Sequence, residues 1–349
     1  MPTLRQGDRI SNYLLDTRLG MGSFGEVWRA KHHVFGDAVA IKIPTDLQYV
    51  RNLQREGVAV HGLRHPNIVR AIDLDPFGDP PYLVMEYVEG PSLRAVVDHY
   101  KTTMPIAAAL AILRGVLQAL SGAHAHGLVH RDIKPPNILL NHPLESVATV
   151  REQAVKVTDF GLGQVGGITA QSILQSGSLQ TDEGRGISGT LAYMSPEQKE
   201  GRPVDARSDL YACGIVLFEM LTGERPQGGD VPSDLRREVP TGLDHVFQRA
   251  YTRYERRFAT ADEMLAALAA TAGPPPIPVK ARPVRRGLSL AENRCPACSE
   301  AVQSNDQFCI TCGHQLAASV PRCPACHAFV HSRDRFCIFC GGDLQILAT

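Results

Sequence analysis

The chain has 349 residues, of which 36 are basic and 36 are acidic, so its formal net charge at pH 7 is zero. This balance argues against a protein that coats a polyanion, and the length exceeds the roughly 100–200 residues usual for one domain. Hydrophobic residues make up 44% and charged residues 21%, as in chains that bury a packed core. We therefore expect two or three folded domains.

The sequence predicts no membrane insertion. The amino terminus carries charged residues early and has no apolar run, so no secretory signal is expected. The apolar stretch at residues 212–221 is ten residues long and includes Glu219. Because a bilayer-spanning helix needs about 20 apolar residues, this stretch is expected to be a buried helix. The chain is expected to be cytoplasmic.

A glycine-rich segment comes first along the chain, in strand-like sequence. Residues 19–27 read LGMGSFGEV and contain the pattern GxGxxG. Glycine lacks a Cβ, so such a backbone can approach a phosphate chain closely. In dinucleotide-binding domains a helix begins at the third glycine. Here β-rich sequence continues through VWRA and AVAIKI, so we expect the glycines to cap a hairpin.

Three further motifs follow in chain order. Residues 39–42 read VAIK, residues 130–137 read HRDIKPPN, and residues 159–161 read DFG after the strand-like VKVT. Together with the glycine-rich loop, these motifs resemble those of the protein kinase family, specifically the bacterial, eukaryotic-like (Hanks-type) Ser/Thr kinases. The resemblance covers residues 10–268.

The resemblance implies an α+β fold of two lobes, a β-rich N-lobe and a helical C-lobe. It also implies transfer of the γ-phosphate of ATP to Ser or Thr hydroxyls of protein substrates, with Mg²⁺ as cofactor. Asp132 is expected to orient the substrate hydroxyl, and Lys134 to reach the γ-phosphate. Asn137 and Asp159 would supply the oxygen ligands that Mg²⁺ prefers.

The nucleotide site is implied in the same way. Lys42 is expected to hold the α- and β-phosphates, and Glu56, ten residues before the proline of an HPN sequence, is placed as the family's helix glutamate that orients this lysine. Backbone groups of Glu86 and Val88 are expected to bond the adenine edge, with Met85 guarding the back of the pocket. The other expected residues of the site come from the glycine-rich loop and the adenine walls: Leu19, Gly20, Gly22, Gly25, Val27, Ala40 and Leu139. For Leu19 and Leu139, a role in the hydrophobic core alone predicts the same burial as a role in the nucleotide site.

The sequence after the DFG resembles the remaining kinase motifs. Residues 189–197 read GTLAYMSPE, like the family's substrate-docking loop. Glu197 is expected to form a structural ion pair with Arg257, and Asp209 to brace the backbone of the catalytic loop.

Two connections are long and polar, and we expect them to be mobile: the activation segment from Asp159 to Glu197, which has 39 residues, and residues 141–154. Arg131 would receive a phosphate on the activation segment. The candidate phosphoacceptors are Thr169, Ser172, Ser176, Ser178, Thr181 and Ser188.

A spacer and an internal repeat complete the chain. Residues 271–287 read TAGPPPIPVKARPVRRG, which cannot bury a core, so a semi-extended linker is expected over residues 271–290. Beyond it, the pattern CxxC-x10-CxxC occurs twice with a period of 28 and holds eight of the nine cysteines. It resembles the double zinc ribbon family over residues 293–345, with units 293–316 and 321–345.

Each ribbon is expected to hold one structural Zn²⁺ through four thiolates. The ligands are Cys295, Cys298, Cys309 and Cys312 in the first unit, and Cys323, Cys326, Cys337 and Cys340 in the second. Disulfides and an iron site of the rubredoxin type are alternatives, although cysteine pairs in a chain without a secretory signal favour metal.

The ribbons are expected to dock a protein partner or to regulate the kinase. Nucleic acid is the less favoured partner, because the tail has few aromatic side chains for base stacking. Two other classes of function stay open. A pseudokinase scaffold requires the loss of Lys42, Asp132 or Asp159, and all three are present. A zinc-binding protein with a secondary kinase part would show a stable partner independent of ATP.

Overall fold

The computed structural model describes residues 4–22, 25–46, 49–160, 191–271, 295–298, 302 and 316. Within these ranges the side chains of Asn52, Arg55, Glu56 and Thr103 lie outside the description. The chain divides into two units, residues 1–275 and 276–349.

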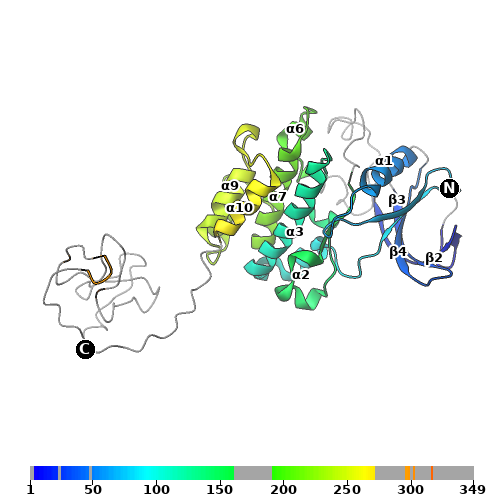
Figure 1. Cartoon of the computed structure of the whole chain (residues 1–349), viewed down its shortest axis with the longest axis horizontal. Coiled ribbons are helices and arrows are strands. Elements are labelled where there is room, and N and C mark those ends of the chain that lie inside the picture. The colour runs from blue at the N-terminus through cyan, green and yellow to red at the C-terminus, as the bar shows by residue number, and fades with distance from the viewer. Residues whose placement is uncertain are drawn as a thin grey trace. The chain divides into compact units, whose positions relative to one another are not determined.

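The N-lobe is a six-stranded antiparallel sheet in the order β1-β2-β3-β4-β6-β5, with one helix beside it (Figure 1). The strands are β1 (Arg9–Ile10), β2 (Tyr13–Gly22), β3 (Gly25–His32), β4 (Ala38–Ile43), β5 (Ala71–Asp75) and β6 (Tyr82–Glu86). Because side chains alternate along a strand, the sheet has two apolar faces. Trp28 and Ile41 pack on one face, and Ala40 packs on the other with Leu53 of α1 (Val50–His61).

The C-lobe is helical and surrounds a short two-stranded ladder of β7 (Ile138–Leu140) and β8 (Val155–Val157). Its helices are α2 (Leu93–Tyr100), α3 (Ile106–Ala125), α6 (Pro196–Lys199), α7 (Ala206–Thr222), α8 (Pro232–Leu235), α9 (Thr241–Ala250) and α10 (Ala261–Thr271). Helix α7 contains the apolar stretch 212–221, and its side chains are buried from Ser208 to Thr222, as expected. The helix ends at Gly223, whose φ of 81° is a left-handed conformation that glycine adopts without strain. The expected α+β fold of two lobes is confirmed.

Helix α3 is the longest helix in the described part of the chain and is strongly apolar. It has 20 residues and a mean hydropathy of 1.6, and in the described part of the chain it is the one helix with the length and composition of a bilayer span. The core helices of soluble proteins share this composition, and 56% of the 18-residue apolar window of α3 is buried inside the protein. The helix packs on α7, α10 and β8, and a Cβ added at Gly115 would lie 2.6 Å from the Cβ of Val155. This close packing accounts for its apolar sequence.

The connection between β7 and β8 is folded, in contrast to the mobile loop that we expected. It contains two 3₁₀ helices, η4 (Leu144–Thr149) and η5 (Glu152–Ala154). Val147 is fully buried. The side-chain amide of Asn67 donates to the carbonyl oxygens of Glu152 at 2.6 Å and Val155 at 2.9 Å. These contacts tie the connection to the segment that joins α1 to β5.

Candidate active site

The glycine-rich segment forms the hairpin between β2 and β3. Gly22 pairs with Gly25 and Gly20 pairs with Val27. A Cβ at Gly25 would lie 2.2 Å from the carbonyl oxygen of Ile43, so a larger residue would prevent the close approach of β4. A strand begins at Gly25 where a dinucleotide-binding domain would begin a helix. The expected hairpin is therefore confirmed.

Lys42 and Asp159 meet although 117 positions separate them. Lys42 lies on β4 with its side chain buried, and its Nζ donates to Oδ1 of Asp159 at 2.7 Å. Asp159 has a φ of 66°, a left-handed conformation that is uncommon outside glycine. Glu56 lies on α1, but its side chain is outside the described residues, so its pairing with Lys42 stays a prediction.

Asp132 is held by two donors from its own loop. Its Oδ2 accepts hydrogen bonds from Nζ of Lys134 at 2.9 Å and from Nδ2 of Asn137 at 3.0 Å. The same Nδ2 donates to the Asp132 carbonyl oxygen at 2.9 Å. Because Asn137 uses its nitrogen on Asp132, its side-chain oxygen is the atom that can face a metal ion.

A carboxylate on α7 fixes the backbone of this loop. Asp209 accepts hydrogen bonds from the amide of His130 at 2.9 Å and from the amide of Arg131 at 2.7 Å. It also contacts Nε2 of His124 at 2.8 Å. On the other side, Nε2 of Gln198 donates to the carbonyl oxygen of Arg131 at 2.7 Å. The expected role of Asp209 in bracing the catalytic loop is confirmed.

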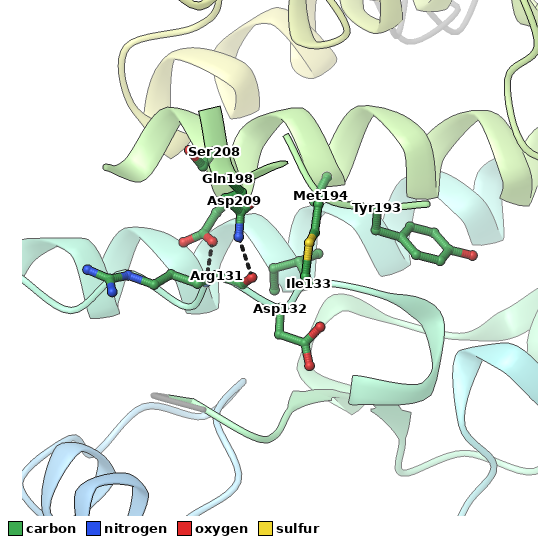
Figure 2. Close-up of a pocket in the computed structure, with 9 residues that line it drawn as sticks. Arg131, Asp132, Ile133, Tyr193, Met194, Gln198, Ser208 and Asp209 are labelled. Carbon is green, nitrogen blue, oxygen red and sulfur yellow. Dashed lines mark hydrogen bonds between the residues drawn. The ribbon is translucent and has the colours of Figure 1, made fainter. Parts of the chain in front are cut away.

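A small pocket lies between the catalytic loop and the segment that precedes α6 (Figure 2). Its lining residues are Arg131, Asp132, Ile133, Tyr193, Met194, Gln198, Ser208, Asp209 and Ala212. Figure 2 shows Ser208 and Asp209 on α7, above the loop that carries Asp132. The segment with Tyr193 and Met194 belongs to the expected docking loop, so the structure brings this loop against the catalytic one. Residues 161–190, which contain the candidate phosphoacceptors, lie outside the described residues.

The docking loop is anchored by a contact that no sequence motif indicated. The Tyr193 hydroxyl donates to the carboxylate of Glu219 on α7, and Nη2 of Arg94 lies 2.5 Å from the same carboxylate and 3.0 Å from the hydroxyl. Burial, together with the nearby Glu219 charge, raises the pKa of Tyr193. The phenol therefore stays protonated and remains a donor.

Strand β6 and the residues after it carry side chains that are expected to line the adenine pocket. Met85 and Val88 are buried, and Leu139 packs against the same cluster. The carboxylate of Glu86 is engaged elsewhere: its Oε1 lies 2.6 Å from Nζ of Lys156. The backbone of Glu86 is thus the part that can face a base. Leu19 is 48% exposed, which excludes the core role for this residue.

Comparison with known proteins agrees with this geometry. A model of the protein kinase domain matches residues 13–270, and a model of the double zinc ribbon matches residues 288–341. The chain belongs to the protein kinase family. Membership implies ATP and Mg²⁺ for the kinase domain, and the ribbon family implies zinc.

Among curated relatives of this kinase are the serine/threonine-protein kinases PknB of Mycolicibacterium smegmatis, 36% identical over 283 residues, and of Mycobacterium tuberculosis, 37% identical over 281 residues. Each alignment covers 73% of this chain and 42% of the relative, so the chain spans less than half the length of these proteins. The crystal structure of the PknI kinase domain of M. tuberculosis superposes with a TM-score of 0.58 at 26% identity, covering 78% of this chain and all of that one.

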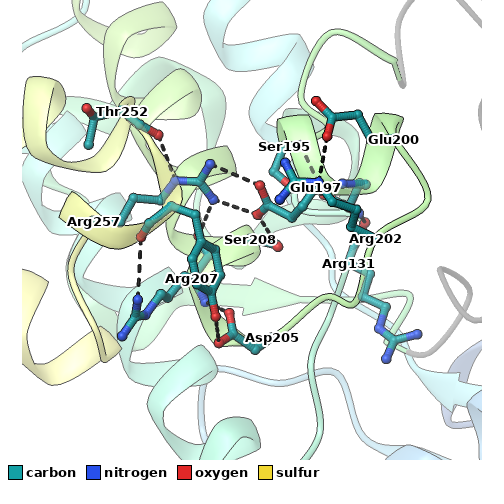
Figure 3. A network of polar contacts seen from close by, with 12 residues as sticks. Arg131, Ser195, Glu197, Glu200, Arg202, Asp205, Arg207, Ser208, Thr252 and Arg257 are labelled. Atoms are coloured by element: carbon teal, nitrogen blue, oxygen red, sulfur yellow. Dashed lines mark hydrogen bonds and ion pairs between the residues drawn. The ribbon is translucent and has the colours of Figure 1, made fainter.

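A buried ion pair between Glu197 and Arg257 supports the C-lobe (Figure 3). Arg257 binds both carboxylate oxygens of Glu197, at 2.6 and 3.1 Å, and Ser208 donates to the same carboxylate at 2.5 Å. Both charged side chains are almost fully buried. Burial alone would raise the pKa of Glu197, but the hydrogen bonds from Arg257 and Ser208 lower it to about 2. The expected structural pair is confirmed.

Removing the cation of this pair is expected to destabilise the kinase domain strongly. Arg257→Met leaves the Glu197 carboxylate buried without its counterion, which costs about 3–5 kcal/mol of unfolding free energy. Urea denaturation of the full chain measures this loss. The exposed pair Arg202–Glu200, 2.5 Å apart, is the matched control, and Arg202→Met should cost less than about 1 kcal/mol. Equal losses in the two variants would contradict the prediction.

The same pair predicts an acid-sensitive stability. Because the pKa of Glu197 is lower in the folded protein than its ordinary 4.5, its contribution is complete above that pH and is lost as the pH falls toward 2.

The first ribbon shows one feature of a thiolate metal site. Cys295 is buried and Cys298 is exposed, and the two lie at the ends of a turn. Within this turn the amide of Ala297 donates to Sγ of Cys295 at 3.4 Å. An amide donor stabilises a thiolate, so this pair fits the zinc that the ribbon family implies. The remaining expected ligands lie outside the described residues: Cys309, Cys312, Cys323, Cys326, Cys337 and Cys340.

Proposed function

We propose that this chain is an active Ser/Thr protein kinase, which transfers the γ-phosphate of ATP to serine or threonine hydroxyls of protein substrates. One observation carries the proposal: Lys134 and Asn137 both hold the carboxylate of Asp132. The ion pair between Lys42 of the N-lobe and Asp159 of the C-lobe also supports the proposal. A pseudokinase scaffold is the weaker alternative, because the chain retains each of these residues.

The mechanism assigns one task to each side chain. Asp132 accepts a hydrogen bond from the substrate hydroxyl and takes its proton as the hydroxyl oxygen bonds to the γ-phosphorus, while the bond from that phosphorus to ADP breaks. Lys134 places a positive charge at the γ-phosphate oxygens, and Lys42 does so at the α- and β-phosphates. Asn137 and Asp159 would hold Mg²⁺, which would neutralise phosphate charge.

The kinase is expected to phosphorylate itself in the activation segment. Arg131 precedes Asp132, and in the described part of the chain its Nε is buried without a hydrogen-bond partner. A phosphate supplies the acceptor that such a guanidinium lacks. Purified chain incubated with Mg-ATP should gain phosphate between Thr169 and Thr190, as read by intact mass and peptide mapping. Equal modification of an Asp132→Asn variant would contradict this expectation.

We place the kinase domain at residues 10–268, the linker at 271–290 and the ribbons at 293–345. For the ribbons we propose docking of a protein partner or regulation of the kinase, with nucleic acid as the less favoured ligand. We also propose a cytoplasmic site of action, since cysteine pairs with metal-ligand spacing require reduced thiols. We further propose that the chain does not insert into a membrane.

A further inference from the structure

A β-bulge leaves an acidic side chain beside an arginine of the N-lobe sheet. Leu15 pairs with Ala30 and Thr17 pairs with Arg29, so Asp16 is the extra residue of β2 and has no partner in the ladder. A bulge re-aims the side chain of its extra residue. Here Oδ2 of Asp16 lies 3.2 Å from Nη1 of Arg29.

Arg29 stands in the row of residues that line the expected adenine pocket. It pairs with Ala40 on β4, and Ala40 pairs with Met85 on β6. Residues paired across antiparallel strands share a face of the sheet, and Val27, two positions earlier on β3, shares it too. Arg29 is thus a cation at the outer end of a row of apolar side chains.

The guanidinium of Arg29 also covers a hinge residue. Its carbon lies 5.2 Å from the ring centroid of Tyr87, which is within range of a cation–π contact. Tyr87 packs against the same apolar cluster as Val27 and lies between Glu86 and Val88, whose backbones are expected to bond the adenine. The contact therefore joins β2, β3 and the hinge.

The burial of these groups indicates which contacts hold the guanidinium in place. The side chains of Arg29 and Asp16 are 34% and 27% exposed, so the pair is partly withdrawn from water. Among the described residues, Nε of Arg29 is buried without a hydrogen-bond partner, which costs free energy. The position of Arg29 is therefore set by Asp16 and Tyr87, and these contacts outweigh the unmet donor.

We propose that Asp16, Arg29 and Tyr87 form a latch that fixes the glycine-rich strands over the hinge and thereby sets the affinity for ATP. The inference rests on the proposed kinase function. Arg29 is a positioning residue in this scheme: it acts through Val27 and the hinge backbone. Without the latch the β2–β3 hairpin can move away from the hinge, and the nucleotide loses contacts with the roof of its pocket.

The first test replaces Arg29 in the full-length chain. Arg29→Leu should raise KM for ATP, and Kd for Mg-ADP measured by calorimetry, about three- to tenfold. Because the reacting groups are untouched, kcat should stay within about twofold. Lys31 is an exposed cation two positions further along β3, and Lys31→Leu is the matched control with the same charge change. Equal KM values in these two variants would overturn the latch.

Tyr87 supplies a second test that is independent of Arg29. Tyr87→Phe keeps the aromatic face and should behave as the wild type, whereas Tyr87→Leu should weaken Mg-ADP binding as Arg29→Leu does. The double variant Arg29→Leu/Tyr87→Leu should be no weaker than either single variant, because both remove the same contact. Additive losses, or a Tyr87→Phe variant as weak as Tyr87→Leu, would show that the ring does not hold Arg29.

Measurement of nucleotide binding also distinguishes a failure of the latch from a failure of the proposed kinase function. A wild-type chain that binds Mg-ADP without transferring phosphate would refute the kinase activity, while the effect of Arg29→Leu on Kd would still decide the latch. A wild-type chain that binds no Mg-ADP would refute both.

Discussion

Lys42→Met and Asp159→Asn are each expected to reduce phosphate transfer at least about a hundredfold. Lys42 is the buried cation whose Nζ lies 2.7 Å from the carboxylate of Asp159, and methionine fills its volume without its charge. Asp159→Asn keeps the shape of the side chain but removes the negative charge that a Mg²⁺ ion requires. Incorporation of labelled phosphate from Mg-ATP into the chain and into a generic protein substrate measures both effects.

The control for the lysine variant is Lys31→Met, which makes the same chemical change at an exposed position of β3. It should retain the wild-type rate. Transfer that survives in both Lys42→Met and Asp159→Asn would refute the assignment of the catalytic site, provided that thermal melting shows each variant folded.

Removal of zinc is expected to unfold the ribbons and to leave the kinase domain folded. A unit shorter than 30 residues cannot bury a sufficient core, so the metal supplies on the order of 10 kcal/mol of its folding free energy. The kinase domain has its own core, built on α3 and α7. Chelation should therefore unfold the ribbons, whereas the kinase domain should continue to transfer phosphate.

Elemental analysis of the full chain gives the number and kind of metal ions. We expect two Zn²⁺ per chain, one in each repeat, because a loop of ten residues closes at a smaller entropic cost than the longer loops of a crossed arrangement. Iron in place of zinc, or fewer than two ions per folded chain, would contradict the assignment. Loss of the kinase fold on chelation would contradict the independence of the two units.

Motif spacing located most of the candidate active site in advance. Phosphoryl transfer requires a few side chains at fixed positions on loops, so HRDIKPPN and DFG identified Asp132, Asn137 and Asp159, which the structure places on two adjoining segments. The brace from Asp209 was also expected, because the resemblance to the kinase family implies that this aspartate contacts the catalytic loop. The roles of these residues in binding and catalysis stay predictions.

The contacts that sequence did not indicate are those set by register and by tertiary packing. The bulge leaves Asp16 without a partner in the ladder, and no local pattern marks it. The ion pair between Glu86 and Lys156 joins the N-lobe to the C-lobe, and neither residue belongs to a motif that would have indicated this contact. No motif in the sequence marks helix α3, because Arg114 and Gln118 interrupt its apolar run, although both occupy the less buried side of the helix.

Two residues of the active site hold the backbone in a strained form. Arg131 and Asp159 have φ values of 68° and 66°, and each costs on the order of 1 kcal/mol in a side-chain-bearing residue. This is a sizeable fraction of the roughly 5–15 kcal/mol by which domains are stable. Glycine at residue 131 would relax the strain but remove the guanidinium that is expected to receive a phosphate, whereas glycine at residue 159 would also remove the carboxylate that pairs with the buried Lys42. Selection for thermostability alone would therefore favour the loss of Arg131, and with it the control by phosphorylation that we propose, so a library screened for melting temperature needs a parallel screen for turnover.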